Sequence, residues 1–356
     1  MSTMVVEKEF EVANENHTAF MCVLYIVLGC LSIIANLTNI LVFMTNRELR
    51  ANYIFHIVVD FGEIVNGISY ITCGIGRGTA YLNGIFATPI TVHDCFYTKY
   101  WPVFLILGTE IPAWMTIVCA IERIVAVHNP ANYRLYFTYR NKLILVFGAL
   151  TCIGGSLTWA AISALYATRL TSTQHCAIIS STGQAFSTFH FAFVPFAYCG
   201  SFLSLCTIAY VHKKTARNMQ TSGKKGPQLK AFIFMTAFDI ILSSMPSIVM
   251  IGASWKLFAP NDIVVSITYS MTGLLSLCHV SMNAVFYSEF TKQVRKLTLR
   301  AMGIQVLSST TGNRIGVTST IMHTTGGMTQ WLGFVALTHK ARVRFPASED
   351  NFFHLS

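Results

Sequence analysis

Seven long apolar runs follow one another along the chain, with short polar segments between them. The runs cover residues 19–44, 53–73, 100–127, 143–166, 186–210, 231–254 and 263–287. A bilayer core about 30 Å thick requires roughly 20 mostly apolar residues in a helix, and every run has that length. The first, fourth and seventh runs contain no Lys, Arg, Asp or Glu. The pattern therefore predicts an all-α bundle of seven transmembrane helices.

Composition and charge support this prediction. The chain of 356 residues is 53% hydrophobic and only 11% charged, with a mean hydropathy of +0.53, whereas soluble domains carry about 25% charged residues. The net charge of +10 does not form one basic patch, so we do not expect nucleic-acid binding. With the N-terminus outside, 20 of the 25 Lys and Arg residues lie on the inner side, and this excess of positive charge predicts that orientation.

The segments outside the runs define three regions. Residues 1–18 are acidic and form the predicted extracellular N-terminal segment, without a cleavable signal peptide. Asn16 begins an Asn-His-Thr triplet, a glycosylation acceptor that also occurs by chance. The domain of seven helices spans 19–302 and ends in a short basic amphipathic helix over 288–302, which would lie on the inner leaflet. Residues 303–356, rich in Ser, Thr and Gly, are predicted to be a disordered cytoplasmic tail.

Besides Glu122 near the end of the third run, four acidic residues lie inside the apolar runs: Asp60, Glu63, Glu110 and Asp239. Charged groups within a membrane are costly and usually functional. Asp60 and Glu63 are separated by three positions and face one side of a helix, so both cannot ionise cheaply and one is protonated or shares a cation. We predict an intramembrane polar network of Asn39, Asp60, Glu63 and Asp239.

Enzyme motifs are missing from the sequence. It contains no HExxH, GxSxG or phosphate-binding loop, and its ten cysteines form no CxxC pair. Most cysteines lie within apolar runs, where they are expected to be small core residues. Cys95 and Cys176 differ, because both lie on the predicted outer, oxidising side. We predict no enzymatic activity and no metal site.

Short motifs stand at the ends of several runs. Glu122-Arg123-Ile124 closes the third run and is followed by Pro130 and Tyr133, and the seventh run ends in Asn283-Ala-Val-Phe-Tyr287. Together with Asn39, Trp159, Pro195 and Pro246, this order resembles the rhodopsin-like G-protein-coupled receptors over residues 19–302. The departures, among them Ile124, Leu203, Ser244 and Ala284, are similar to those of the nematode serpentine chemoreceptor families.

The resemblance implies a chemosensory receptor of the plasma membrane, for example in a sensory cell, which converts binding of a small extracellular ligand into activation of a heterotrimeric G protein. It implies a coupling and activation role for Glu122, Arg123, Pro130, Tyr133, Asn283 and Tyr287. It also implies a ligand pocket containing Leu105, Thr109, Glu110, His190 and Tyr269. A Cys95–Cys176 disulfide and a sodium ion near Asp60 follow from the same resemblance.

Several alternatives remain open from sequence alone. Glu122-Arg123 is either a latch that holds the resting state or a stop signal whose side chains reach the membrane surface. Glu110 either contacts the ligand or pairs with a neighbouring helix. The ligand is either a small molecule or a peptide. An ion-coupled transporter is the alternative of another class, although the two halves of the chain show no internal repeat.

Overall fold

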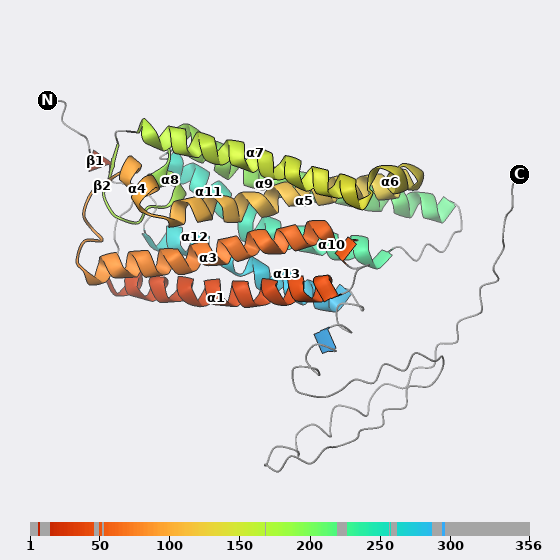
Figure 1. The fold of residues 1–356 in the computed structure, drawn as a ribbon, viewed down its shortest axis with the longest axis horizontal. Coiled ribbons are helices and arrows are strands. Elements are labelled where there is room, and N and C mark those ends of the chain that lie inside the picture. Colours follow the sequence, from red (N-terminus) through yellow and green to blue (C-terminus); the bar gives the residue numbers. More distant parts are fainter. Residues whose placement is uncertain are drawn as a thin grey trace, which may run out of the picture. The chain divides into compact units, whose positions relative to one another are not determined.

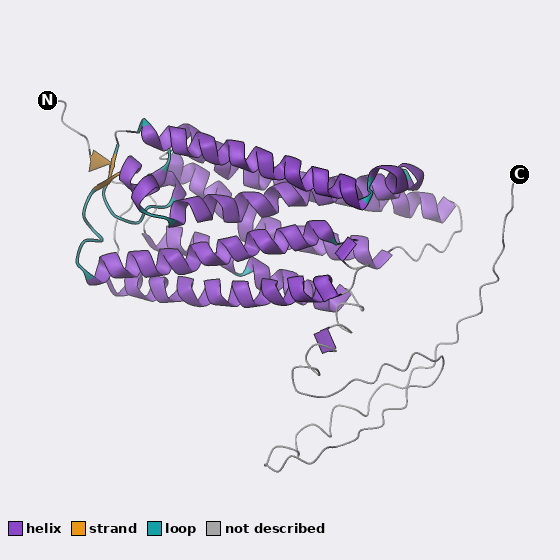
Figure 2. Ribbon diagram, in the orientation of Figure 1, coloured by secondary structure: helices purple, strands orange, loops and turns teal. Residues whose placement is uncertain are grey.

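The computed structural model describes residues 6–7, 15–45, 50–51, 53–167, 169–218, 226–255, 257, 262–286 and 294–295. These residues all belong to one unit of the chain, residues 1–306. They are mostly helical (Figure 2). The principal helices are α1 (Glu15–Thr45), α3 (Ile54–Leu82), α5 (Trp101–His128), α7 (Tyr139–Leu165), α9 (Gln184–Asn218), α10 (Gly226–Asp239), α11 (Met245–Ser254), α12 (Asp262–Gly273) and α13 (Leu275–Phe286).

Six helices in the described part of the chain are long and apolar enough to cross a membrane. Five of them are α1, α3, α5, α7 and α9, and the sixth is formed by α10 and α11 with the short π-helix η1 (Ile240–Ser244) between them. Figure 1 shows α1, α3, α5 and α7 side by side with a common long direction. The first six predicted runs are therefore confirmed as membrane-length helices, and α3 extends nine residues beyond the predicted end of the second run.

The seventh predicted run forms two helices instead of one. Residues 262–286 are divided at Leu274 into α12 and α13, each of 12 residues. A helix of 12 residues is only about 18 Å long, so neither helix alone reaches across a bilayer core.

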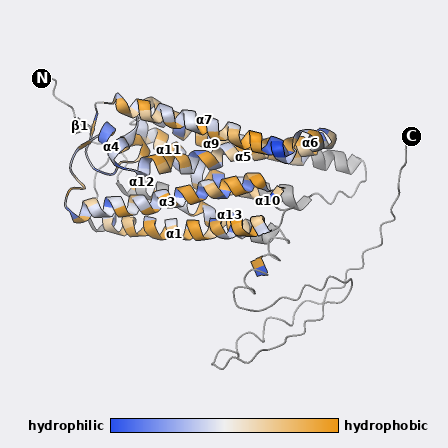
Figure 3. Cartoon of the chain, in the orientation of Figure 1, coloured by the Kyte–Doolittle hydropathy of each residue, from blue (hydrophilic) through white to orange (hydrophobic). Residues whose placement is uncertain are grey.

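The helices place apolar side chains outside and polar side chains inside. On α1, Phe20, Ile34 and Leu41 are each 62% exposed, whereas Asn36 and Asn39 are fully buried. Figure 3 shows hydrophobic residues along the length of α1 and α7. In water this arrangement would expose a large apolar surface, but in lipid it is the stable one because the polar groups must find partners within the bundle. We conclude that the chain is a multi-pass membrane protein.

Small residues allow the first two spans to pack closely. A Cβ atom added to Gly29 of α1 would lie 2.5 Å from the carbonyl oxygen of Gly67 in α3. One added to Gly74 would lie 2.6 Å from the carbonyl oxygen of Cys22. Because helices in lipid gain little from the hydrophobic effect, such close backbone contact is an important source of their association.

The π-helix in the sixth span has a local cause. Pro246, the second residue of α11 after η1, provides no backbone N–H to the helix, and its ring crowds the preceding turn. Widening the helix over Ile240–Ser244 relieves this crowding. The π-helix includes Ser243 and Ser244, and both are buried.

Short elements gather around the segment between α7 and α9. The strands β1 (Val6–Glu7), β2 (Ile90–Thr91) and β3 (Leu170–Thr171) form a sheet in the order β1-β3-β2, with β3 parallel to β1 and antiparallel to β2. The helices α4 (Val92–Thr98) and α8 (Ile178–Ser181) follow β2 and β3. The expectation of an all-α chain missed this sheet, because strands of two residues have no detectable periodicity. At the other end, α6 (Pro130–Tyr136) joins α5 to α7.

Two predicted regions lie largely outside the described residues. They are the amphipathic helix over 288–302, of which only Val294 and Arg295 are described and are helical, and the tail over 303–356. The orientation of the N-terminus stays a prediction.

Candidate functional site

A disulfide ties the α7–α9 segment to α4. Cys95 and Cys176 are bridged, with 5.3 Å between their Cα atoms, and both are fully buried. The predicted pairing is thereby confirmed. Cys95 lies in α4. The N-cap residue of this helix is Thr91, whose side chain accepts a hydrogen bond from the backbone N–H of Asp94 at 3.0 Å.

Further bonds hold the same segment in place. The indole Nε1 of Trp101, at the start of α5, donates to the carbonyl oxygen of Cys176 at 3.0 Å. Nε of Arg77, near the end of α3, donates to the carbonyl oxygen of His175 at 2.8 Å. Cys176 itself has a φ of +46°, a backbone conformation that is uncommon in residues other than glycine. The surrounding contacts must stabilise this conformation. We call residues 170–183 the lid.

An outer pocket lies next to the lid, with about 340 Å³ of space between its atoms. Its wall includes Ile178 of the lid and side chains from α5, α9, η1, α11 and α12. Thr109, His190, Ser247 and Thr268 supply polar groups, and Met250 belongs to the apolar part. The pocket is therefore built where three membrane-length helices, α12 and the lid meet.

Glu110 and His190 form a buried pair beside this pocket. Glu110 Oε1 lies 2.9 Å from His190 Nδ1, and both side chains are at most 1% exposed. Ser156 of α7 donates to the same carboxylate oxygen at 2.7 Å. His190 Nε2 lies 3.1 Å from the hydroxyl oxygen of Thr109. The cluster joins α5, α7 and α9, so Glu110 does pair with neighbouring helices, as one of the two sequence alternatives expected.

The predicted ligand-pocket residues have different locations. Thr109 and His190 line the outer pocket, whereas Glu110 stands behind His190 and is not among the lining residues. Leu105, one turn before Thr109 on the same face of α5, packs in the apolar core with Trp101 and the disulfide and is not among the described lining residues. The side chain of Tyr269 lies outside the described part of the structure.

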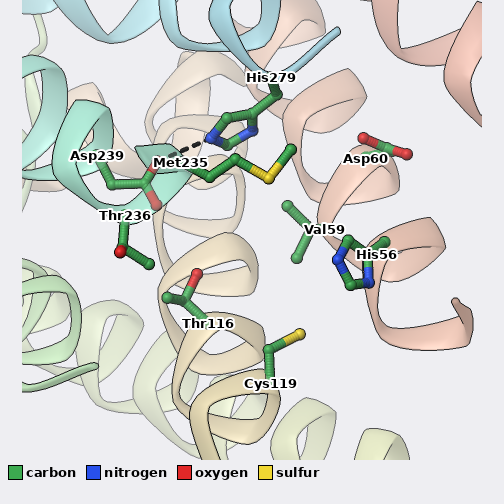
Figure 4. Close-up of a pocket in the computed structure, with 9 residues that line it drawn as sticks. All are labelled: His56, Val59, Asp60, Thr116, Cys119, Met235, Thr236, Asp239 and His279. Atoms are coloured by element: carbon green, nitrogen blue, oxygen red, sulfur yellow. Dashed lines mark hydrogen bonds and ion pairs between the residues drawn. The ribbon is translucent and has the colours of Figure 1, made fainter. Parts of the chain in front are cut away.

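An inner pocket of about 400 Å³ lies between α3, α5, α10 and α13 (Figure 4). His279 Nε2 contacts Asp239 Oδ1 at 2.8 Å, and this bond connects α13 to α10. Asp60 and His56 of α3 line the same pocket. All four ionisable side chains are buried.

The predicted polar network surrounds this pocket. Asn39 of α1 donates to Asp60 Oδ1 at 3.1 Å. Glu63 Oε2 accepts from Ser276 of α13 at 2.9 Å, and the hydroxyls of Ser276 and Ser32 are 2.8 Å apart. Asp60 Oδ2 is buried and has no hydrogen-bond partner among the described residues. The acids of α3 and α10 thus connect these helices to α1 through Asn39 and to α13 through Ser276 and His279.

A third cluster surrounds Glu122 at the end of α5 that adjoins α6. Lys142 Nζ of α7 lies 2.7 Å from Glu122 Oε1, with side chains 4% and 2% exposed. The hydroxyl of Tyr133 in α6 donates to the same oxygen at 3.1 Å. Burial and the Glu122 carboxylate raise the pKa of Tyr133 to about 12, so this hydroxyl keeps its proton. The described buried ion pair of Glu122 is thus with Lys142, a residue that no sequence motif singled out.

The other predicted coupling residues are only partly described. Arg123 is partly buried. Its positive charge interacts electrostatically with the side chains of Tyr53 and His56 at the start of α3. Pro130 begins α6, but its side chain is not described. The same holds for the side chain of Asn283 in α13, and Tyr287 lies outside the described residues. Asn16 lies in the first turn of α1, and its glycosylation stays a prediction.

Three functional candidates escaped the sequence analysis: Lys142, Ser156 and His279. Each is a single polar residue in or beside an apolar run, and no short motif surrounds it. Only His279 had a signal that could have been noticed. It is a histidine within the seventh run, which contains no Asp, Glu, Lys or Arg.

Fold and clusters together define a helical multi-pass membrane protein with a disulfide-held lid, an outer pocket and a buried acidic interior. No family model matches the sequence, and no curated protein matches it.

Proposed function

We propose that the protein is a seven-helix receptor of the plasma membrane that converts binding of a small extracellular ligand into activation of a heterotrimeric G protein. In this proposal α12 and α13 together form the seventh span, broken at Leu274, and the lid faces the outside. Residues 262–286 would then reach about 37 Å as a stack of two helices, enough for a bilayer core.

The main support for the proposal is α5, because this helix contributes residues to the outer cluster, the inner pocket and the Glu122 cluster. Trp101 at its start bonds to the lid, and Thr109 and Glu110 form one side of the outer cluster. Thr116 and Cys119 line the inner pocket, and Glu122 holds α6 and α7 through Tyr133 and Lys142. From Thr109 to Glu122 is about 20 Å along the helix. A ligand that shifted α5 would therefore change contacts at both ends.

The Glu122 cluster supports a resting-state latch. A buried ion pair needs good geometry and additional hydrogen bonds to offset desolvation, and Lys142 and Tyr133 supply both. If the pair forms only in the resting state, removing its charge shifts the population toward the active state. Arg123, next in sequence, would then be released toward the G protein.

The test compares variants in a G-protein activation assay, normalised to receptor at the cell surface. Glu122→Gln keeps a hydrogen-bonding group but removes the charge, and it should raise ligand-free activity several-fold. Adding Arg123→Ala should abolish that increase. Arg140→Ala is the matched control, because Arg140 is an exposed cation at the same end of the bundle. Equal small losses in all three variants would show that these charges only determine topology.

The buried acids favour a second candidate, an ion-coupled transporter. Asp60 and Asp239 line the inner pocket, Glu63 follows Asp60 by three residues on α3, and one oxygen of Asp60 has no partner among the described residues. Such acids occur in ion and proton pathways. Reconstitution in vesicles separates the two: gradient-driven ion flux without any effect on nucleotide exchange would replace the receptor proposal with a transporter.

A further inference from the structure

We propose that α6 lies in the headgroup layer of the bilayer, with Leu135 and Tyr136 against lipid, and that this lipid contact keeps the hydroxyl of Tyr133 bonded to Glu122. The partner of this surface is therefore membrane lipid. The lipid contact is independent of the proposed function, and only its effect on the Glu122 cluster rests on that function.

One face of α6 packs against the bundle. The hydroxyl of Tyr133 donates to Glu122 Oε1 at 3.1 Å. The ring of Tyr133 stacks on Phe137, the C-cap residue of α6, with 5.4 Å between the ring centroids. Phe137 in turn packs against a buried apolar core that includes Met115 of α5 and Val146 of α7. This face is therefore fixed to the ends of α5 and α7.

Another face of α6 carries exposed apolar side chains. Leu135 is 66% exposed and Tyr136 is 59% exposed. Exposed apolar positions continue along the chain into α7, where Tyr139, Ile144 and Phe147 are between 49% and 66% exposed. Because α7 is a membrane-length helix, its exposed apolar side chains face lipid. The exposed face of α6 is thus continuous with a surface that lipid covers.

The lengths of the neighbouring helices place α6 at a suitable depth. With 28 and 27 residues, α5 and α7 are about 42 Å and 40 Å long. The hydrocarbon core is about 30 Å thick, and the bilayer with its headgroup regions is about 40–45 Å thick. Helices of this length end in the headgroup layer, and α6 joins their ends (Figure 1). Tyrosine is enriched at this level, and an interfacial helix inserts its apolar side chains there.

The lipid contact and the Glu122 cluster act on the same short helix. α6 has only seven residues, so Tyr133 cannot leave Glu122 by a movement of α6 unless Leu135 and Tyr136 also move. Lys142 Nζ lies 5.9 Å from the centroid of the Tyr133 ring, so such a movement would uncover the ion pair as well. Lipid around one face of α6 therefore stabilises the latch on the other face.

A tryptophan reporter tests the lipid contact directly. The full-length protein is placed in phosphatidylcholine nanodiscs, in which part of the lipid is brominated on the acyl chains near the headgroup. The fluorescence that Tyr136→Trp adds to the wild type should be lost in brominated lipid and should be protected from iodide in the water. Phe147→Trp on α7 is the lipid-facing reference. Quenching of the Tyr136→Trp reporter by iodide but not by brominated lipid would overturn the lipid contact.

A polar substitution tests the link to the latch. Leu135→Gln removes the apolar side chain at nearly unchanged helix propensity, and should raise ligand-free nucleotide exchange on a G protein roughly twofold or more. The conservative variant Leu135→Met restores an apolar side chain and should return the exchange rate to that of the wild type. In a Tyr133→Phe background the hydroxyl is already absent, so adding Leu135→Gln should cause no further increase.

A G protein is the competing occupant of this face. In that case Leu135→Gln would lower nucleotide exchange with or without Tyr133→Phe, and the lipid proposal would be overturned. Unchanged ligand-free exchange in Leu135→Gln, alongside an increase in Glu122→Gln, would overturn the link to the latch. If no variant and no wild-type protein supports nucleotide exchange, the proposed function fails, whereas the fluorescence of Tyr136→Trp still decides the lipid contact.

Discussion

At the residue scale, single buried groups decide how the lid responds to pH. His175 precedes the bridged Cys176 and is 3% exposed. Burial and the positive charge of Arg77 hold the pKa of His175 well below its usual range. The folded protein therefore keeps this imidazole neutral at pH values where the unfolded chain binds a proton.

This difference predicts that the stability contributed by His175 is present above pH 6.5 and is lost as the pH falls below it, since the unfolded state then takes up the proton. Between pH 7.5 and 5.5 the loss should be about 1 kcal/mol. Melting temperatures of the wild type and of His175→Gln across this range would measure it, because the glutamine removes the titration. Parallel pH profiles of the two proteins would contradict the prediction.

At the element scale, helices are joined by pairs of polar side chains. Asp239 connects α10 to His279 of α13, and Glu63 connects α3 to Ser276 of the same helix. Each bond fixes the rotation of α13 relative to its neighbours, since only one face of a helix carries these residues. The short α13 is thus positioned by polar bonds as well as by packing.

A double-mutant cycle should reveal this connection. Asp239→Ala or His279→Ala alone leaves a buried ionisable partner, and removing one member of such a pair costs about 3–5 kcal/mol. The double variant should cost no more than the worse single variant, because it leaves neither partner behind. Thermal stability in nanodiscs measures all four corners, and Ser281→Ala, an exposed position of α13, is the control. Additive losses would show that the two side chains act independently.

At the scale of the whole molecule, the proposal depends on whether α12 and α13 together cross the membrane. Seven spans place the termini on opposite sides, and six place them on the same side. The excess of Lys and Arg on one side predicts that the N-terminus is outside.

Epitope tags at the two termini test this count directly. In intact cells, antibody should label the N-terminal tag, and the C-terminal tag only after permeabilisation. Labelling of both tags in intact cells, or of neither, would reduce the number of spans to six and remove the basis for a seven-helix receptor. A cytosolic marker protein verifies that the cells are intact.

The sequence by itself determined the membrane class and the approximate position of each span, because both depend on the length of an apolar run and little else. Six of the seven runs form membrane-length helices, with ends within a few residues in most cases. The pairing of Cys95 with Cys176 was also expected, from the resemblance of the chain to a receptor family, and the structure contains that bridge.

Only the tertiary structure decided which polar residues meet. Glu110 meets His190, Glu122 meets Lys142, and Asp239 meets His279, across sequence distances that no local pattern spans. The break at Leu274 and the packing of Leu105 in the apolar core were decided in the same way. The physical reason is rotation: an apolar run predicts that a helix crosses the membrane, but the direction in which each polar side chain points is established only when the helices pack against one another.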